Sequence, residues 1–197
     1  MARKKSPEKK DQIRKAAIRV ISKVGFYNCT TDRIAQEAGV SVGTIYNYFK
    51  DKENILSYIF EVEQKKLHIY FRKLNKKNIV VPEKIKYLIK EYFDFIYKHR
   101  DLFQILNDEI NKPVRGLKEE IFNYGILIHK YIKEILVEGC NKGSIRENID
   151  IDMMAYMMLS SANSVAHMGF LNPESIEDIF DRAAENVYKF FQNGIFT

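Results

Sequence analysis

A short stretch near the N-terminus carries side chains whose types and spacing suit hydrogen bonding to the edges of DNA bases. Helical spacing turns Ile45 and Phe49 to the same, inward side of a short helix. An asparagine can donate and accept at once, as an adenine edge requires, and a tyrosine ring can lie on a thymine methyl group. The residues left on the open side of this helix are Val42, Gly43, Tyr46, Asn47 and Lys50.

Other groups in the same stretch are suited to contacts with phosphate. The hydroxyls of Tyr46 and Tyr48 can donate hydrogen bonds, and lysines at 50 and 52 can neutralise charge. Helices are also expected to begin at Thr31 and Lys52, where first-turn N–H groups attract anions. The alternative is that the aromatic residues only fill a core. That interpretation is preferred for Phe49 and stays open for Tyr48.

The elements that position these side chains follow from capping residues and apolar spacing. Ser6-Pro7-Glu8 predicts the start of a first helix, with a left-handed C-cap at Gly25. A second helix is predicted from Thr31 to Ala38 and a third from Ser41. Gly39 between them allows the positive φ of a tight turn. Residues 31–50 therefore have the length and turn of a helix-turn-helix.

Helical periodicity continues to the end of the chain, and no alternation typical of strands is long enough to predict a sheet. A fourth helix capped by Asp51 is expected from Lys52 to about Lys77, about 39 Å long. Four to six further helices are expected, with breaks near Pro113, Gly116 and Pro173. The predicted fold class is all-α, in which residues 1–52 form a DNA-binding domain and residues 53–197 form a ligand-binding and dimerisation domain.

The charge of the chain is concentrated at its N-terminus. Residues 1–52 hold 12 Lys and Arg against 5 Asp and Glu, whereas residues 53–197 hold 20 against 21. Twenty of the 25 Phe and Tyr residues lie in the second segment. A basic module joined to an aromatic body favours binding to a polyanion, with nucleic acid ahead of an anionic membrane. The alternative is a lysine-rich surface that is merely solvated.

Several other classes of protein receive little support from the residues. Cys29 and Cys140 cannot form a disulfide framework, and the N-terminus lacks the apolar segment of a secretory signal. The only long stretch without charge, residues 153–173, is too polar to span a membrane. Four histidines fall on separate helices without metal-ligand spacing, so no metal and no cofactor are expected. Ser160, Ser161 and His167 lack the motif around a catalytic serine.

The segment Thr30 to Leu56, TTDRIAQEAGVSVGTIYNYFKDKENIL, closely resembles the DNA-binding segment of the TetR family of bacterial repressors. The resemblance spans about 50 residues and implies an all-helical, cytoplasmic homodimer that binds a palindromic operator. Val42 departs from members that have a lysine at its position, which removes one phosphate contact. Carried over position by position, the implied DNA contacts are Thr31, Ser41, Val42, Gly43, Tyr46, Asn47, Tyr48 and Lys52.

The body is expected to hold a small apolar ligand. The uncharged helix from Asp150 to Gly169 carries methionines on more than one face, so one side is expected to line a pocket and the other to meet a partner subunit. The resemblance implies that this helix and the last one form a four-helix bundle across a dimer. The predicted lining of an elongated apolar cavity is Phe93, Tyr97, Phe103, Leu106, Phe122, Tyr124, Met157 and Ser161.

Three functions account for these features to different degrees. A ligand-responsive repressor explains the charge division, the helix-turn-helix and the aromatic body together. The pattern at 43–56, with residues 138–148, resembles the branch of fatty-acid-metabolism repressors that respond to acyl-CoA, so a fatty acyl compound or a drug-like molecule is the expected ligand. The alternatives are a small-molecule enzyme with a basic appendage and an architectural nucleic-acid binder. The latter leaves the apolar body unexplained.

Overall fold

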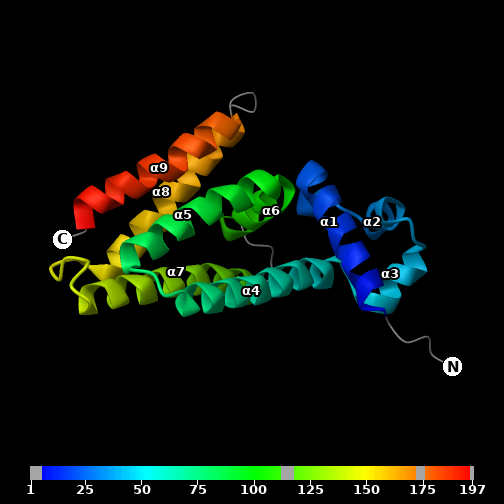
Figure 1. The fold of residues 1–197 in the computed structure, drawn as a ribbon. Coiled ribbons are helices and arrows are strands. Elements are labelled where there is room, and N and C mark those ends of the chain that lie inside the picture. Colours follow the sequence, from blue (N-terminus) through cyan, green and yellow to red (C-terminus); the bar gives the residue numbers. More distant parts are fainter. Residues whose placement is uncertain (1–5, 112–117, 172–175, 196–197) are drawn as a thin grey trace. The chain divides into compact units, whose positions relative to one another are not determined.

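The computed structural model describes the backbone of residues 6–111, 118–171 and 176–195, in which every regular element is an α-helix (Figure 1). This confirms the all-α prediction. The expected breaks at Pro113, Gly116 and Pro173 lie outside the described residues. The helices are α1 (Pro7–Asn28), α2 (Thr31–Ala38), α3 (Val42–Tyr48), α4 (Lys52–Lys76), α5 (Val81–Lys98), α6 (Arg100–Asn111), α7 (Lys118–Asn141), α8 (Ile151–Leu171) and α9 (Ile176–Ile195).

The helices form two compact units. The first unit comprises Met1–Leu67 and Arg100–Gly125, and the second comprises His68–His99 and Ile126–Thr197. The division falls within α4 and α7, so each of these helices contributes to both units. A functional boundary after residue 52 stays a prediction, because the first unit also contains α6 and the first part of α4.

The first unit is built around α1, which packs against α2 and α6. The Ser6 hydroxyl caps α1 by accepting from the Lys9 N–H, as predicted. Arg14 is buried within the apolar stripe of α1, and its guanidinium donates to Asp11 at 2.8 Å and to buried Glu63 of α4 at 3.3 Å. This charged contact joins α1 to α4 inside the unit.

The predicted left-handed C-cap at Gly25 is wrong in its detail. Gly25 has a positive φ of 75°, but its ψ of 159° is extended, and one more helical turn follows as far as Asn28. Phe26 lies directly beyond the glycine and is buried. The chain therefore bends at Gly25 and brings the Phe26 ring into the core before α1 ends.

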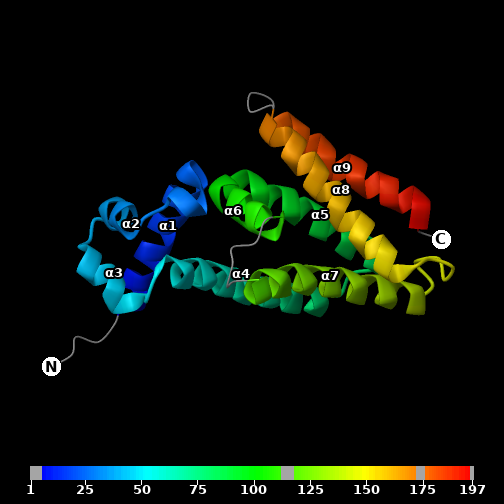
Figure 2. The same ribbon diagram turned by 180° about the vertical axis from the view of Figure 1, so that it is seen from behind.

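The second unit packs α5 along α9, with α8 beside α9 in both views (Figures 1 and 2). The rings of Phe93 and Phe180 lie 5.6 Å apart between α5 and α9. A Cβ on Gly169 of α8 would lie 2.4 Å from the Phe180 ring, so only glycine fits this contact. Elsewhere in the unit, the buried Lys84 of α5 donates to both carboxylate oxygens of Glu138 of α7 at 2.8 Å.

Candidate nucleic-acid interface and ligand-binding body

The turn between α2 and α3 has the geometry expected of a helix-turn-helix. Gly39 adopts the left-handed conformation, with φ 62° and ψ 40°, and its N–H donates to carbonyls at the end of α2. Thr30 caps α2 by accepting from the Arg33 N–H at 3.3 Å. Ser41 caps α3 by accepting from the Thr44 N–H at 3.1 Å. These caps confirm the predicted starts of both helices.

The sides of α3 also match the prediction from spacing. Ile45 and Phe49 are 1% and 2% exposed, whereas Tyr46 is 55% exposed and Asn47 is exposed as well. Gly43 is exposed, and the nearest atom to a Cβ built there would be the Ser41 hydroxyl at 3.9 Å. The backbone at Gly43 is therefore accessible to a large partner. A partner facing α3 would meet the Tyr46 phenol and the Asn47 amide together.

Predicted contacts from α2 and α3 lie close to one another. The Tyr46 hydroxyl is 3.4 Å from the Thr31 hydroxyl, at the N-terminal end of α2. The N–H groups of a helix's first turn lack partners within the helix and carry partial positive charge. A phosphate at this end of α2 would therefore lie next to a base-reading side chain of α3. Ser41 is exposed, and Val42 is half-buried.

Tyr48 has a structural contact that the sequence did not reveal. It is half-buried, and its hydroxyl oxygen accepts a hydrogen bond from the Ser6 N–H at 2.9 Å. The hydroxyl proton is not used in that bond, so it remains able to donate. Tyr48 thus ties the end of α3 to the start of α1 and keeps a donor for a phosphate.

The two lysines after α3 differ sharply in their surroundings. Lys50 is exposed. The Lys52 ammonium donates to the carbonyls of Phe26, Tyr27 and Cys29 at 3.1–3.3 Å, at the end of α1. An ammonium has three N–H donors, and these bonds can occupy all of them. Lys52 therefore anchors the last turn of α1 to the start of α4, a role that spacing along the sequence could not indicate.

The predicted ligand residues divide between the two units. Phe103, Leu106 and Tyr124 are buried in the first unit, where burial raises the pKa of the Tyr124 hydroxyl and keeps it protonated. The members in the second unit are buried Phe93, exposed Tyr97 and Met157, and half-buried Ser161. The side chain of Phe122 lies outside the described residues. The single apolar cavity lined by this set stays a prediction.

One hollow in the second unit includes two of the predicted residues. It has a volume of about 510 Å³ between α5 and α9, and its lining includes Phe93 and Tyr97. Most of the remaining lining is charged, with Lys86, Asp94 and Asp181 among it. Charged residues therefore make up most of this lining, unlike that of the apolar cavity expected from the sequence.

The sequence did not reveal the ion pairs that join distant helices within each unit. Arg14 pairs with buried Glu63, and Lys84 pairs with half-buried Glu138, so each pair holds a buried basic side chain. A charged residue within an apolar helical stripe could have indicated such a pair, because a buried charge needs a partner from another element. Its partner lies about 50 positions along the chain, beyond any local pattern.

Further properties bear on the class of protein. In the described ranges, no group of three or more His, Cys, Asp or Glu side chains is placed to hold a metal ion. None of the helices described combines the length and apolar character that crossing a membrane requires. Both cysteines are free thiols, and burial raises the pKa of Cys29 against the lowering effect of Lys52 and Arg33.

Comparison with protein families decides between the functions left open above. The family described as bacterial regulatory proteins, tetR family, matches residues 13–59, and a tetracyclin repressor-like C-terminal domain matches residues 80–186. The second match alone covers more than half of the chain. The chain belongs to the TetR family. Its helix-turn-helix lies within the first match, and α5, α6, α7 and α8 lie within the second.

Similar proteins give this TetR-family chain a biochemical context. The fatty acid metabolism regulator protein of Bacillus subtilis is 26% identical over 166 residues, which cover 84% of this chain and 86% of the regulator. The fatty acid degradation regulator FadR of Bacillus halodurans has a TM-score of 0.82 and 25% identity, covering 94% of this chain and 97% of that one.

The same fold occurs in FadR of Bacillus subtilis in complex with stearoyl-CoA, with a TM-score of 0.77 and 24% identity over 90% of this chain and 97% of that one. The similar proteins are regulators of transcription. The TetR-family chain is accordingly a DNA-binding transcriptional regulator and not an enzyme.

Proposed function

We propose that the chain is a homodimeric repressor that leaves its operator when a fatty acyl ligand occupies its body. The observation that carries the DNA-binding part is the open side of α3. Tyr46 and Asn47 are exposed there, and the Tyr46 hydroxyl lies 3.4 Å from Thr31 at the start of α2. In helix-turn-helix proteins the second helix enters the major groove with its N-terminal half toward the bases.

The base contacts are assigned to the open side of α3. Asn47 reads an adenine edge through its amide, and Tyr46 contacts a thymine methyl group or a phosphate. Gly43 lets the backbone approach the DNA, and Ser41 lies beside it. Val42 supplies no charge at its position and packs against the DNA surface.

The phosphate contacts are assigned to the surrounding helix ends. Thr31 binds a phosphate at the start of α2, Tyr48 donates its remaining proton, and Lys50 supplies positive charge. The Lys52 ammonium is held by three carbonyls, so Lys52 contributes its backbone N–H at the start of α4 and positions the head.

Dimerisation is assigned to α8 and α9. In one chain, α8 exposes large side chains toward both of its ends on one side, with Ser160 and Ser164 between them, and α9 exposes Phe190 at 64%. Apolar surface of this extent favours association with a second copy. Two recognition helices about 34–36 Å apart would then meet successive major grooves of a palindromic operator. The exposed residues of α8 are Met153, Tyr156, Met157, Met168 and Leu171.

The ligand is assigned by similarity to the relatives. A fatty acid metabolism regulator aligns with most of the chain, and a protein of the same fold binds stearoyl-CoA. The aromatic and methionine-rich body suits an acyl chain. Binding there would shift the dimer toward a state with lower DNA affinity, and a coupling of about 5- to 150-fold is typical of such regulators.

The DNA assignment is tested by measuring binding to an operator selected from a random duplex library. Tyr46→Ala and Asn47→Ala should keep the wild-type fold and lose the preference for the selected sequence. Gln36→Ala is the matched amide control, since Gln36 is exposed on α2. Retention of full sequence preference by both α3 variants would show that α3 is not the recognition helix.

The ligand assignment is tested by native mass spectrometry of the protein purified from its expression host, followed by addition of stearoyl-CoA to the DNA complex. A dimer that carries an acyl compound and releases its operator on addition of stearoyl-CoA is expected. A dimer that stays on its operator at saturating acyl-CoA would exclude this ligand class.

A further inference from the structure

The last part of α4 carries the strongest local excess of positive charge in the body. Residues 65–77 contain six Lys and Arg and no Asp or Glu, although residues 53–197 as a whole carry a net charge of −1. Cations near the C-terminal end of a helix are favoured by its dipole. The dipole explains basic residues around the helix end, but it does not explain why some of them converge on one hollow.

Three of these six basic residues have contacts of their own. Lys65 pairs with Glu61 at 2.5 Å, and Lys66 pairs with Glu63 at 2.7 Å. The Lys77 ammonium lies over the Tyr87 ring, 3.6 Å from its centroid. None of these three side chains lines the hollow that Arg72 and Lys76 reach.

Arg72 and Lys76 line a hollow of about 340 Å³ together with His68, Asn75 and Tyr131. His68, Arg72 and Lys76 are spaced by four residues, so they lie along one side of α4. Among the described residues that line this hollow there is no carboxylate. Arg72 and Lys76 would therefore attract an anion into the hollow without competition from a lining carboxylate.

The inner wall of the hollow is held in place by packing. The Tyr131 ring of α7 stacks on buried Phe71 of α4, with ring centres 4.0 Å apart and planes 8° apart. The Tyr131 hydroxyl is hydrogen-bonded to Nδ1 of His68. Burial and the charge of Glu134 raise the pKa of Tyr131, and Glu134 lies 3.9 Å from the Lys130 ammonium. The neutral phenol of Tyr131 and the guanidinium of Arg72 therefore line the same hollow.

We infer that this hollow binds a phosphate group, and, resting on the proposed function, that the phosphate belongs to the effector. A guanidinium can bind two phosphate oxygens at once, a lysine adds a point charge, and the Asn75 amide supplies a neutral donor. The Tyr131 hydroxyl adds a second neutral donor when Nδ1 of His68 carries the proton of their shared hydrogen bond. The volume suits one or two phosphates of a small molecule. The source is either the phosphate-bearing end of an acyl-CoA or a separate phosphorylated metabolite.

Isothermal titration calorimetry of the full chain tests this site with three probes: stearoyl-CoA, stearate and inorganic pyrophosphate. The test variant is Arg72→Gln/Lys76→Gln. The control, Lys73→Gln/Lys98→Gln, removes the same charge from exposed positions outside the hollow. Lys76→Glu is a second test variant that places a carboxylate in the hollow, and circular dichroism checks that each variant keeps its helices.

The expected result is that the test variant binds stearoyl-CoA about tenfold or more weakly, since it loses charge-assisted hydrogen bonds, while its affinity for stearate is unchanged. If the test variant loses pyrophosphate binding and keeps its stearoyl-CoA affinity, the phosphate site is supported and a separate metabolite is its source.

The inference is overturned if the test and control variants are indistinguishable with both phosphate-bearing probes. A wild-type protein that does not bind stearoyl-CoA or stearate would refute the acyl ligand of the proposed function. The pyrophosphate titration would still decide the phosphate site.

Discussion

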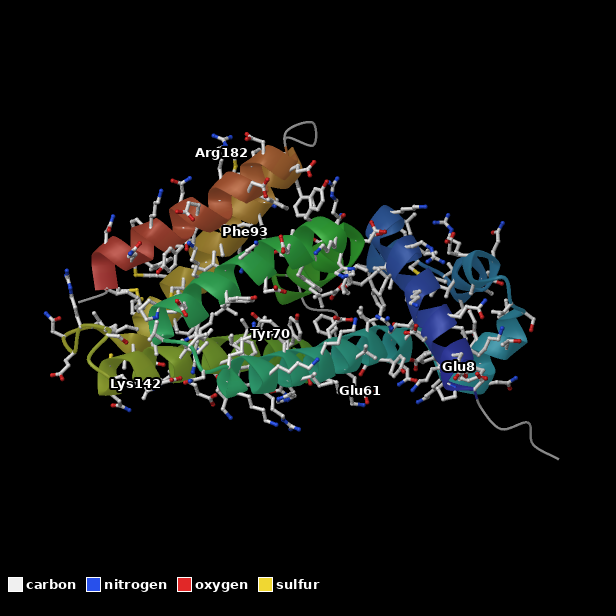
Figure 3. All side chains as sticks on the ribbon, in the orientation of Figure 1. Glu8, Glu61, Tyr70, Phe93, Lys142 and Arg182 are labelled. Atoms are coloured by element: carbon white, nitrogen blue, oxygen red, sulfur yellow. The ribbon has the colours of Figure 1, made fainter. Side chains whose placement is uncertain are left out.

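At the scale of single residues, the Tyr70 hydroxyl stands out because its oxygen is buried without a hydrogen-bond partner among the described residues. Figure 3 places Tyr70 between α4 and α5, where burial and the neighbouring Glu91 and Tyr87 raise the pKa of the phenol. The hydroxyl is therefore neutral at physiological pH. A buried hydroxyl left without a partner costs about 1–3 kcal/mol of folding free energy.

Tyr70→Phe should therefore stabilise the protein by about 1 kcal/mol, because it removes the unpaired oxygen and keeps the ring. Urea denaturation measures the change in the free energy of unfolding. Tyr92→Phe is the matched control, since the Tyr92 hydroxyl is hydrogen-bonded to Asn163, and its loss should destabilise the protein by a similar amount. Destabilisation by Tyr70→Phe would mean that the hydroxyl makes a favourable contact.

The ion pair between buried Lys84 and half-buried Glu138 gives stability a dependence on pH. Burial acts to raise the pKa of Glu138, but hydrogen bonds from Lys142 and Lys84 outweigh it and hold the pKa below its ordinary value of 4.5. The contribution of Glu138 to stability is therefore complete above about pH 4.5 and is lost as the pH falls through the lower, folded-state pKa.

Glu138→Gln should destabilise the protein at pH 7 by about 3 kcal/mol, because Lys84 is left as a buried charge without its counter-ion. Chemical denaturation from pH 7 to pH 3 should show this difference shrinking below pH 4.5. Glu134→Gln is the control, since its pairing with Lys130 is exposed and 3.9 Å long. A difference that is constant with pH would contradict the assigned role of the Glu138 charge.

At the scale of helices, the end of α1 depends on a residue of α4. The Lys52 ammonium satisfies three carbonyls at the end of α1, where the chain bends at Gly25. Terminal helix carbonyls otherwise rely on water or local caps. The link fixes the position of α1 relative to the start of α4, and so the position of the helix-turn-helix within the first unit.

Lys52→Met should lower the melting temperature and weaken operator binding, since about 1–3 kcal/mol of hydrogen bonding to the α1 carbonyls is lost. Lys50→Met is the comparison. It should leave the melting temperature unchanged and weaken binding to all DNA sequences alike. The slope of log affinity against log salt concentration should fall by about one, the equivalent of one phosphate contact. Calorimetry and binding at several salt concentrations separate the two effects. A wild-type melting temperature for Lys52→Met would contradict the anchoring role.

At the scale of the whole molecule, the large apolar side chains that α8 exposes are a feature left unburied in one chain. Gly169 and Ala162 of α8 are buried within the chain, toward α9 and its neighbours, and the large side chains lie on the other side. The methionines of α8 therefore lie on more than one face, as predicted, and Ser160 and Ser164 lie between the exposed ones. The side that carries Gly169 packs against α9 within the chain.

Met168→Glu should convert the proposed dimer to a monomer at micromolar concentration, because it places a charge among the exposed apolar side chains of α8. Light scattering coupled to size exclusion measures the mass. Operator affinity should fall when the mass falls to that of a monomer, since a monomer meets only one half-site. Val80→Glu is the control, an equally exposed apolar residue at the start of α5 that should leave the dimer intact. A Met168→Glu dimer would place the interface elsewhere.

The local elements of this protein were predictable because their causes are local. Ser6, Thr30, Ser41 and Asp51 each cap the helix that follows, and Gly39 takes the left-handed conformation that its turn requires. Helical spacing also predicted that Ile45 and Phe49 would be buried and Tyr46 exposed. Each outcome depends on residues within about one helical turn, so the sequence alone determined the helix-turn-helix and the side of α3 that it presents.

Tertiary packing alone decided the contacts between residues distant in the sequence. The partners Arg14–Glu63, Lys52 with the α1 carbonyls, and Lys84–Glu138 are 49, 23–26 and 54 positions apart. The hollow lined by His68, Arg72 and Tyr131 likewise exists only where α7 lies against α4. Burying a charge requires a partner at hydrogen-bond distance, and only the packing of helices against one another determines which partner is there.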